Sequence, residues 1–318
     1  MRVGIPTEVK NNEFRVAITP TGVAELTRRG HHVVIQAGAG KGSSISDADF
    51  KAAGAEIVSG AERVWAEAEL LLKVKEPIEP EYPLLHRGQT VFAYLHLAAS
   101  SQCTEALLRS GVTSIAYETV QIDDGHLPLL APMSEVAGRL AAQVGAYHLM
   151  KPAGGRGILM GGVPGTGPAD VVVIGTGTVG YNAARVASGM GAHVTVFDVN
   201  IDKLREIDAE FGGRIRTRYS SRLELEGAVK RADVVIGAVL VPGHKAPKLV
   251  SNVLVAQMKP GAVVLDISID QGGCFEDSRP TTHDEPTFRV YDTVFYCVTN
   301  MPGVVPRTST FALTNATM

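Results

Sequence analysis

The chain has 318 residues, of which 45% are hydrophobic and 20% are charged, and its formal net charge is -3. This near balance leaves no basic surplus to bind a nucleic acid or an anionic membrane surface, so we expect neither as a partner. No apolar run approaches the length that spans a bilayer, and the opening "MRVGIPTEVK" is typical of a first strand and not of a signal peptide.

The three cysteines, Cys103, Cys274 and Cys297, form no CxxC pair and show no metal-ligand spacing. Free thiols are typical of a reducing compartment, so we expect a cytoplasmic protein. We expect no zinc or other metal site.

Short runs rich in Val, Ile and Leu alternate with helical patterns along nearly the whole chain, which predicts an α/β fold with parallel sheets. At this length two domains are expected. In the first half a helix is expected over 19–30, where Thr19 is the N-cap, Pro20 takes the first helical position and Gly30 ends the helix. The strands expected there are 2–5, 32–37, 69–74, 90–97 and 113–118.

A long helical pattern over 133–151 lies in the middle of the chain, opened by Ser134 with Glu135 in its first turn. Such a helix is suited to bridge two domains. Residues 152–168 follow with seven glycines and three prolines, which excludes a regular helix and predicts a loop or irregular hairpin at the boundary. An oligomer contact is an equally open interpretation of this stretch.

The second half repeats the alternation of strands and helices. The expected fold is therefore two Rossmann-like doubly wound α/β domains with predominantly parallel sheets, joined by long helices. We expect one domain to contain 1–130 and 306–318 and the other to contain 131–305. The strands expected in the second half are 170–175, 193–198, 214–219, 233–239, 262–268 and 294–299.

The stretch "VVVIGTGTVGYNAARVASGMGAHVTVFDVN" carries the strongest single motif. Gly175, Gly177 and Gly180 have the GxGxxG spacing between an expected strand and an expected helix. In that setting the first glycine permits the tight turn, the second admits a pyrophosphate, and the third lets the helix pack closely on the strand. The phosphates then lie over the helix N-terminus, whose N–H groups and dipole favour negative charge.

An acidic residue follows the motif at the required place. Asp198 ends the next expected strand, 18 residues after Gly180. A carboxylate there accepts hydrogen bonds from the adenosine ribose and repels a 2′-phosphate, so the motif indicates NAD and not NADP. Lys203 lies within reach of the same ribose region. The strand, the helix and the acid together disfavour the alternative that the glycines merely turn the chain.

Candidate cations for a substrate lie in the first half. "LLLKVKEP" places Lys73 and Lys75 near the end of an apolar strand, where an α/β sheet presents its ligand crevice. Alternation puts both lysines on one face, and we expect Lys73 to reach solvent. Arg15 lies between Phe14 and Val16, where it either pairs with a structural carboxylate or binds a ligand carboxylate with two nitrogens.

Two further residues are candidates for proton transfer. His96 lies near the end of the apolar run "TVFAYLHLAAS", and Asp270 follows a strand and precedes two glycines. Each has a structural alternative, a hydrogen-bonded core histidine or a turn-forming aspartate. Taken together, however, Arg15, Lys75 and His96 lie on separate elements of one domain, and a small α-keto or α-amino acid needs such a set.

Seven segments over essentially the whole chain resemble the NAD-dependent L-alanine dehydrogenase family. The NAD(H)-binding component of proton-translocating transhydrogenase is related and shares the N-terminal pattern and the lysine strand. That component has no histidine in the place of His96, so "VKEP" together with "YLHLA" favours the dehydrogenase. The seven segments are "MRVGIPTEVKNNEFRVAITP", "LLKVKEP", "YLHLA", "APMSEVAGRLA", "VVVIGTGTVGYNAARVA", "DQGG" and "CVTNMPGVVPRTST".

The resemblance implies reversible conversion of pyruvate, ammonium and NADH into L-alanine, NAD and water. The domain of 1–130 and 306–318 would bind the substrate and the domain of 131–305 would bind NAD. Arg15 would bind the substrate carboxylate and Lys75 the carboxylate or carbonyl, while His96 would act as general acid and base.

On the cofactor side, Ser134 would meet the phosphates or the nicotinamide end, and Asp198 the ribose. Asp270 would assist proton transfer to and from the carbinolamine and would also lie against the cofactor. The other residues that would line the dinucleotide groove are Ser220, Val239, Leu240, Ile267, Asn300 and Met301.

The resemblance also implies a homohexamer. The printed chain ends inside a predicted helix that starts near Thr310, and family members continue for several tens of residues. Two alternative functions stay open, a nucleotide-binding module of a transhydrogenase complex and a catalytically silent NAD-binding scaffold. His96 counts against the first alternative, and the joint presence of Arg15, Lys75, His96 and Asp270 counts against the second.

Overall fold

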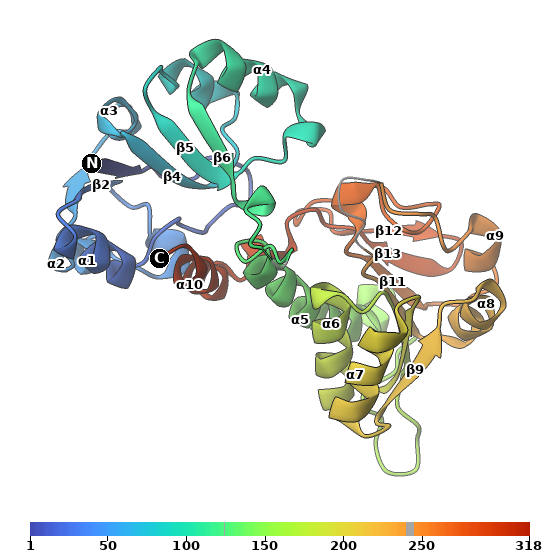
Figure 1. Cartoon of the computed structure of the whole chain (residues 1–318). Coiled ribbons are helices and arrows are strands. Elements are labelled where there is room, and N and C mark those ends of the chain that lie inside the picture. Colours follow the sequence, from blue (N-terminus) through green and yellow to red (C-terminus); the bar gives the residue numbers. More distant parts are fainter. Residues whose placement is uncertain (124, 240–244) are drawn as a thin grey trace. The chain divides into compact units, whose positions relative to one another are not determined.

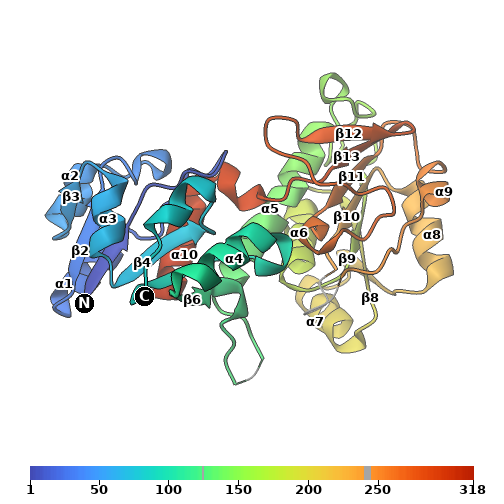
Figure 2. The same ribbon diagram turned by 90° about the horizontal axis from the view of Figure 1, so that it is seen from above.

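A computed structural model describes residues 1–123, 125–239 and 245–318. The chain divides into two compact units, which we call unit 1 (Met1–Met133 with Pro302–Met318) and unit 2 (Ser134–Met301). Each unit has a central sheet with helices on its two faces (Figures 1 and 2). In the part of the chain that is described, no helix combines the length and apolar character needed to cross a membrane.

The sheet of unit 1 has six strands, all parallel, in the order β3-β2-β1-β4-β5-β6. The order reverses between β1 and β4, and α/β sheets bind ligands outside the carboxyl ends of the strands at such a point. The strands are β1 (Arg2–Ile5), β2 (His32–Gln36), β3 (Glu56–Val58), β4 (Leu70–Lys75), β5 (Thr90–Tyr94) and β6 (Thr113–Ala116).

Helices of unit 1 lie on both faces of this sheet, with α1, α2 and α10 on one face and α3 and α4 on the other (Figure 1). Thr19 caps α1 as predicted, because its side chain accepts a hydrogen bond from the N–H of Gly22, and Pro20 is the first helical residue. The α-helices are α1 (Pro20–Arg28), α2 (Asp47–Ala52), α3 (Ala61–Glu67), α4 (Ser101–Ser110) and α10 (Pro306–Thr317); the 3-10 turns are η1 (Lys41–Ser43), η2 (Glu79–Leu84), η3 (Leu97–Ala99) and η4 (Tyr117–Thr119).

The sheet of unit 2 has seven strands in the order β12-β13-β11-β10-β7-β8-β9. All neighbours are parallel except β12 and β13, and the order reverses between β7 and β10. The strands are β7 (Asp170–Ile174), β8 (His193–Asp198), β9 (Ile215–Tyr219), β10 (Val234–Gly237), β11 (Val263–Asp266), β12 (Thr287–Val290) and β13 (Thr293–Tyr296).

The core of unit 2 fills the space between this sheet and its helices, with α6 and α7 on one face and α8 and α9 on the other (Figure 1). Along the chain, α5 runs from the end of unit 1 into unit 2. The α-helices are α5 (Ala131–His148), α6 (Thr178–Gly189), α7 (Ile201–Phe211), α8 (Arg222–Arg231) and α9 (Asn252–Val255); the 3-10 turns are η5 (Lys151–Ala153), η6 (Ile269–Gln271) and η7 (Met301–Val304).

The predicted fold class, two doubly wound domains with predominantly parallel sheets, is confirmed, but two local expectations were wrong and two strands were not expected. The strand expected over 90–97 ends at Tyr94, because His96 takes a left-handed backbone conformation. The helix expected to open at Ser134 begins at Ala131 and ends at His148, so Ser134 lies within it. The strands β3 and β12 were not expected; both are short, and each mixes polar with apolar residues.

Candidate active site

The loops and strand ends at the carboxyl edge of unit 1 hold the three candidate substrate residues. Arg15 lies in the loop that follows β1, Lys75 is the last residue of β4, and His96 comes two residues after β5. Because β1, β4 and β5 are adjacent and parallel, these three residues follow the same ends of neighbouring strands. The site therefore lies at the point where the strand order reverses.

Arg15 is buried and held in a fixed orientation by Glu13. Its Nε donates to Oε1 of Glu13 at 2.7 Å, its second terminal nitrogen donates to Oε2 at 2.5 Å, and only 2% of the Arg15 side chain is exposed. The remaining terminal nitrogen lies 3.1 Å from the sulfur of Met133. This two-point pairing sets the plane of the guanidinium and leaves its other edge facing Met133. Glu13 is thus a partner that the sequence analysis did not identify.

The expectation that Lys73 reaches solvent was wrong. Its side chain is 1% exposed, and its Nζ lies 3.0 Å from Glu8 and 2.8 Å from Glu81. Burial opposes the charge of Lys73, but the two carboxylates outweigh it and raise the pKa of the lysine. Burial raises the pKa of Glu8 as well, against the effect of Lys73 and of the Val74 N–H group. Lys73 is therefore a structural charge with two acidic partners.

Lys75 follows an irregularity in β4. Leu72 pairs with Phe92 and Lys75 with Tyr94, so β4 has one residue more than β5 over this step. Such a bulge turns the strand and changes the direction of the side chains after it. The Lys75 side chain is itself mostly buried, with 8% of the residue exposed.

His96 has an unusual backbone for a residue other than glycine. Its φ of 45° and ψ of 44° lie in the left-handed region, which such residues adopt at a cost. The ring is about one-third exposed (32%), and its Nδ1 lies 4.0 Å from Oε1 of Glu118. The ring also stacks on Tyr94, with centroids 6.1 Å apart. Left-handed backbone at a candidate acid–base residue is a feature of functional sites.

Glu118 and Tyr94 are neighbours of His96 that the sequence analysis missed. The hydroxyl of Tyr94 donates to the Leu129 carbonyl, and burial raises the pKa of Tyr94, against the effect of the Arg15 charge. Tyr94 is therefore a neutral, fixed surface beside the imidazole. The signal that could have identified Glu118 is that it is the last residue of the strand expected over 113–118, in a domain whose strand ends carry the candidate site.

The glycine loop of unit 2 has the geometry that dinucleotide binding requires. Gly175 has φ of 93°, and a Cβ on Gly180 would lie 1.8 Å from the Gly175 carbonyl oxygen. A Cβ on Gly177 would meet no protein atom within 4 Å, so the space beside it is open. α6 begins at Thr178, immediately after that space. An open space at a helix N-terminus fits the pyrophosphate of NAD.

Asp198 lies at the end of β8, and its carboxylate also organises the glycine loop. Oδ2 accepts hydrogen bonds from the N–H and the hydroxyl of Thr176, at 2.7 and 2.6 Å, and Oδ1 accepts the N–H of Asn200 at 2.8 Å. Burial raises the pKa of Asp198, but these hydrogen bonds outweigh it, and the pKa lies below its usual value. The carboxylate is therefore ionised and next to the loop, as a ribose-binding acid must be.

Several predicted cofactor residues lie along the same edge of the unit 2 sheet. The N–H of Ser220 donates to the Asp198 carbonyl, and that of Ile267 donates to the Gly237 carbonyl. Val239 directly follows Ala238, which lies against Gly175. These contacts link the carboxyl end of β8 to that of β9, and the carboxyl end of β10 to those of β7 and β11.

The remaining cofactor candidates lie on helices and turns. Ser134 lies one helical turn before Gly138, whose missing Cβ lets α5 approach the first turn of α6. Lys203 is exposed in the first turn of α7. Asn300 accepts a hydrogen bond through its carbonyl from His283 at 2.8 Å, and Met301 is buried at the start of η7. Leu240 falls outside the described residues.

Asp270 lies on η6, just after β11, and its side chain is exposed. The buried acid of this loop is Asp266, which the sequence analysis missed. It accepts hydrogen bonds from the N–H of Ser268 at 3.0 Å and of Cys274 at 2.9 Å, and from the hydroxyl of Ser278. Burial raises the pKa of Asp266, against the effect of these bonds. Asp266 thereby closes the loop that carries Asp270.

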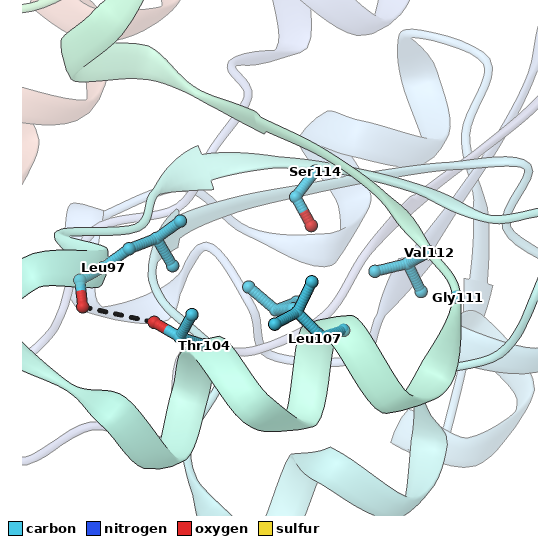
Figure 3. A pocket seen from close by; sticks show the side chains of 7 residues that line it. Leu97, Thr104, Leu107, Gly111, Val112 and Ser114 are labelled. Carbon is cyan, nitrogen blue, oxygen red and sulfur yellow. Dashed lines mark hydrogen bonds between the residues drawn. The ribbon is translucent and has the colours of Figure 1, made fainter.

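Two cavities of about 370 Å³ lie in unit 1, and neither contains the three candidate substrate residues. One lies beside the loop after β1, with Glu8, Lys10 and Glu13 among its lining residues. The other lies between α4 and β6 and is lined by apolar, glycine or hydroxyl-bearing residues, where Thr104 donates to the Leu97 carbonyl (Figure 3). Among the described residues, no group of three or more His, Cys, Asp or Glu side chains is arranged to hold a metal ion.

Comparison with known proteins gives matches over the whole chain. The family models described as "Alanine dehydrogenase/PNT, N-terminal domain" and "Alanine dehydrogenase/PNT, C-terminal domain" match residues 4–137 and 141–318. An alanine dehydrogenase of Mycolicibacterium smegmatis is 79% identical over 318 residues, which are 100% of this chain and 86% of that protein. One of Mycobacterium tuberculosis is 78% identical with the same coverage.

Solved structures agree with these matches. A structure described as L-alanine dehydrogenase superposes with a TM-score of 0.97 at 50% identity, over 100% of this chain and 88% of that one. A transhydrogenase structure from Sinorhizobium meliloti superposes with a TM-score of 0.84 at 26% identity, over 100% of this chain and 92% of that one. The identity to the alanine dehydrogenase structure is thus about twice the identity to the transhydrogenase structure. The chain belongs to the alanine dehydrogenase family.

Proposed function

We propose that this chain catalyses the reversible, NAD-dependent oxidative deamination of L-alanine to pyruvate and ammonium. As a member of its family the chain is an NAD-dependent amino-acid oxidoreductase. The observation that carries the proposal is the edge of the unit 1 sheet, where Arg15, Lys75 and His96 follow three adjacent parallel strands. Two cations on one sheet edge are suited to bind a substrate carboxylate, and a histidine beside them is suited to transfer protons at the substrate nitrogen.

The substrate carboxylate is assigned to Arg15 and Lys75. The guanidinium of Arg15 is fixed by Glu13 and is therefore oriented before any ligand arrives. Lys75 supplies a second positive charge, for the carboxylate or for the carbonyl oxygen of pyruvate. A fixed guanidinium and a second, buried cation hold a three-carbon acid in one orientation, which is catalysis by positioning.

The proton transfers are assigned to His96 and Asp270. In the deamination direction His96 takes a proton from the alanine ammonium, so the nitrogen lone pair forms an imine as hydride leaves the α-carbon. Asp270 assists removal of a proton from the water that adds to the imine carbon. His96 then returns its proton to the nitrogen of the carbinolamine. Asp270, which has passed its first proton to solvent, accepts the carbinolamine hydroxyl proton as the carbonyl forms and the C–N bond breaks. The ammonia that leaves takes up one of the released protons to become ammonium. The overall products are pyruvate, ammonium, NADH and one proton.

NAD, when bound, supplies the hydride chemistry. The residues proposed to hold it are the three glycines of the loop and Asp198, supported by the open space at Gly177 and by the ionised carboxylate beside it. The further residues proposed to line its groove are Ser134, Lys203, Ser220, Val239, Leu240, Ile267, Asp270, Asn300 and Met301.

We also propose that the protein is cytoplasmic and assembles as a homohexamer. The family resemblance supports the assembly, and three unpaired cysteines support a reducing compartment. Native mass spectrometry of the purified chain tests the assembly, since a hexamer gives one species of six times the chain mass. A stable monomer would contradict it.

The experiment that tests the proposed reaction measures formation of NADH at its absorbance with L-alanine as the substrate. We expect NAD to be reduced and NADP to be reduced much more slowly, because Asp198 repels a 2′-phosphate. Reduction of NADP at an equal rate would contradict the assignment of Asp198. Absence of alanine-dependent reduction of either dinucleotide would contradict the proposed function.

A further inference from the structure

Two acidic side chains hold the backbone of the unit 1 sheet at the residues proposed to act on the substrate. Glu8 lies in the loop after β1, and Glu118 lies in η4, directly after β6. Each carboxylate reaches a neighbouring strand and accepts two successive backbone N–H groups there. In each case the second N–H group belongs to a proposed substrate-acting residue, Lys75 for Glu8 and His96 for Glu118.

Glu8 fixes the bulge of β4. The extra residue between Leu72 and Lys75 leaves N–H groups outside the regular ladder with β5. Oε1 of Glu8 accepts the N–H of Val74 at 2.6 Å, and Oε2 lies 3.4 Å from the N–H of Lys75. The ammonium of Lys73, 3.0 Å from Oε2, balances the charge of the carboxylate. Glu8 therefore sets the direction in which β4 presents Lys75.

Glu118 fixes the left-handed backbone of His96. Its Oε1 accepts the N–H of His96 at 2.6 Å, and both of its oxygens lie 3.2 Å from the N–H of Leu95. Successive N–H groups that converge on one anion are a known way to hold this backbone conformation. The same Oε1 lies 4.0 Å from Nδ1 of the His96 ring. The Glu118 carboxylate thus contacts both the backbone N–H group and the ring of His96.

Both carboxylates are themselves held in place. The Glu8 side chain is 2% exposed and is tied to Lys73, which also pairs with Glu81. Glu118 follows Tyr117, a fully buried residue whose ring packs edge-on against Tyr94 at 5.1 Å. Glu8 therefore cannot turn away without loss of a buried ion pair, and the Glu118 side chain is only 16% exposed.

We propose that Glu8 and Glu118 are positioning residues, which aim Lys75 and His96 at the substrate by holding the N–H groups at the ends of β4 and β5. This inference rests on the proposed function. Neither carboxylate needs to touch the substrate, since each acts through the backbone of another residue. A displacement of about 1 Å at a proton-transferring group costs on the order of 100-fold in rate, so loss of Glu118 is expected to act on kcat. Loss of Glu8 displaces a binding group and is expected to act on KM.

Glu8 and Glu118 are expected to affect different kinetic constants. Measurement of kcat and KM in variants of each residue therefore tests the proposal. We expect Glu8→Gln to raise the KM for pyruvate about 10-fold and to change kcat by less than about 2-fold, because Lys75 binds and does not transfer protons. We expect Glu118→Gln to lower kcat about 10-fold or more, because His96 transfers protons. The KM for NADH is expected to stay within about 2-fold in both variants.

Asp49→Asn is the matched control. The Asp49 carboxylate also accepts a backbone N–H, that of Ser46 at 2.9 Å, but it does so in the cap of α2. This variant is expected to lower the thermal midpoint and to leave kcat and both KM values unchanged. If either Gln variant does not fold, the same kinetic constants are measured in Glu8→Asp and Glu118→Asp. These variants keep the negative charge on a side chain that is one methylene shorter.

The reference variants are Lys75→Met and His96→Ala. Wild-type kinetics in both Gln variants, beside inactive reference variants, would contradict the positioning role alone. Rates are divided by the concentration of NADH-binding sites, because a loss of folded protein lowers the apparent kcat and leaves both KM values unchanged. A normal kcat per NADH-binding site in Glu118→Gln, or an unchanged KM for pyruvate in Glu8→Gln, would also contradict the positioning role. Full activity in the two reference variants would contradict the proposed function and the positioning role together.

Discussion

Lys73 is a buried charge beside the candidate site, directly before the last two residues of β4. Its ammonium has two carboxylate partners, and all three side chains are almost completely buried. Removal of one member of such a group leaves uncompensated charge out of water, which is far more costly than loss of an exposed pair.

We therefore expect Lys73→Met to lower the free energy of unfolding of unit 1 by about 3–5 kcal/mol. Lys51→Met, a change of the same kind at an exposed position, is expected to have little effect. Urea unfolding followed by circular dichroism measures both. Equal midpoints for the two variants would contradict the structural role of Lys73.

His96 is the residue whose chemistry the proposed reaction needs most. We expect His96→Ala to abolish turnover, because no other group in the proposal takes the proton from the substrate nitrogen. NADH affinity is expected to stay nearly unchanged, since the cofactor residues belong to the other unit. Steady-state rates and fluorescence titration with NADH separate the two quantities. Loss of both together would indicate a histidine that is only structural.

At the scale of elements, the turn from β7 into α6 combines two glycines with different physical requirements. A Cβ on Gly180 would lie 1.8 Å from the Gly175 carbonyl oxygen, whereas a Cβ on Gly177 would meet no protein atom within 4 Å. Gly180 is required by the packing of the protein, and Gly177 only by the ligand proposed to lie above it.

This difference predicts two separable outcomes. Gly180→Ala is expected to lower both the thermal midpoint and NADH affinity, because helix and strand must move apart. Gly177→Ala is expected to leave the midpoint nearly unchanged and to weaken NADH binding, because its methyl group enters the pyrophosphate space. Thermal unfolding and NADH titration test the pair. Unchanged NADH affinity in Gly177→Ala would place the dinucleotide elsewhere.

The end of β5 shows where sequence patterns are insufficient at this scale. The apolar run over 90–97 predicts a strand through His96, but the strand stops at Tyr94. An apolar run that contains neither glycine nor proline does not show where φ becomes positive, and the left-handed turn at His96 is held by Glu118, which is more than 20 residues away. For the same reason Lys73 was assigned to solvent, since both of its acidic partners come from other segments.

Elsewhere the spacing of residues close together in the sequence was sufficient to predict the structure. The glycine loop, the cap at Thr19 and the acid at the end of β8 depend on residues close together in sequence, and the structure has each of these features where the pattern predicts it. The supporting residues Glu8, Glu13, Glu118 and Asp266 were not identified. Their roles come from side chains that meet only after the strands are ordered into sheets.

At the scale of the whole molecule, the cysteines of both units share one property. Cys103, Cys274 and Cys297 are all buried. Burial raises the pKa of Cys103 to about 11 and of Cys297 to about 12, and it raises that of Cys274 well above its usual value. The thiolate is the reactive form, so these thiols are protonated and slow to react at neutral pH.

We expect the native protein to react with an aromatic disulfide reagent at pH 8 far more slowly than the urea-unfolded protein, which should release three equivalents of the chromophore. Stoppered anaerobic samples followed by absorbance give both rates. Rapid reaction of one equivalent in the native protein would show that at least one thiol is accessible and ionised.

The doubly wound architecture of both units followed from the alternation of strand and helix patterns, because each crossover from strand to parallel strand is local in sequence. The strand orders, which reverse between β1 and β4 and between β7 and β10, place the candidate residues at two such reversal points. With a substrate site proposed at the first reversal and a dinucleotide site at the second, the protein is expected to carry out the reductive amination of pyruvate with NADH.

The most direct test of this claim is the oxidation of NADH by the purified chain, followed by absorbance, with pyruvate and ammonium added separately and then together. We expect oxidation only when both are present, because the carboxylate of pyruvate is bound by Arg15 and Lys75 and its carbonyl must first condense with ammonia. Oxidation with pyruvate alone, or none with both while NADH still binds, would contradict it.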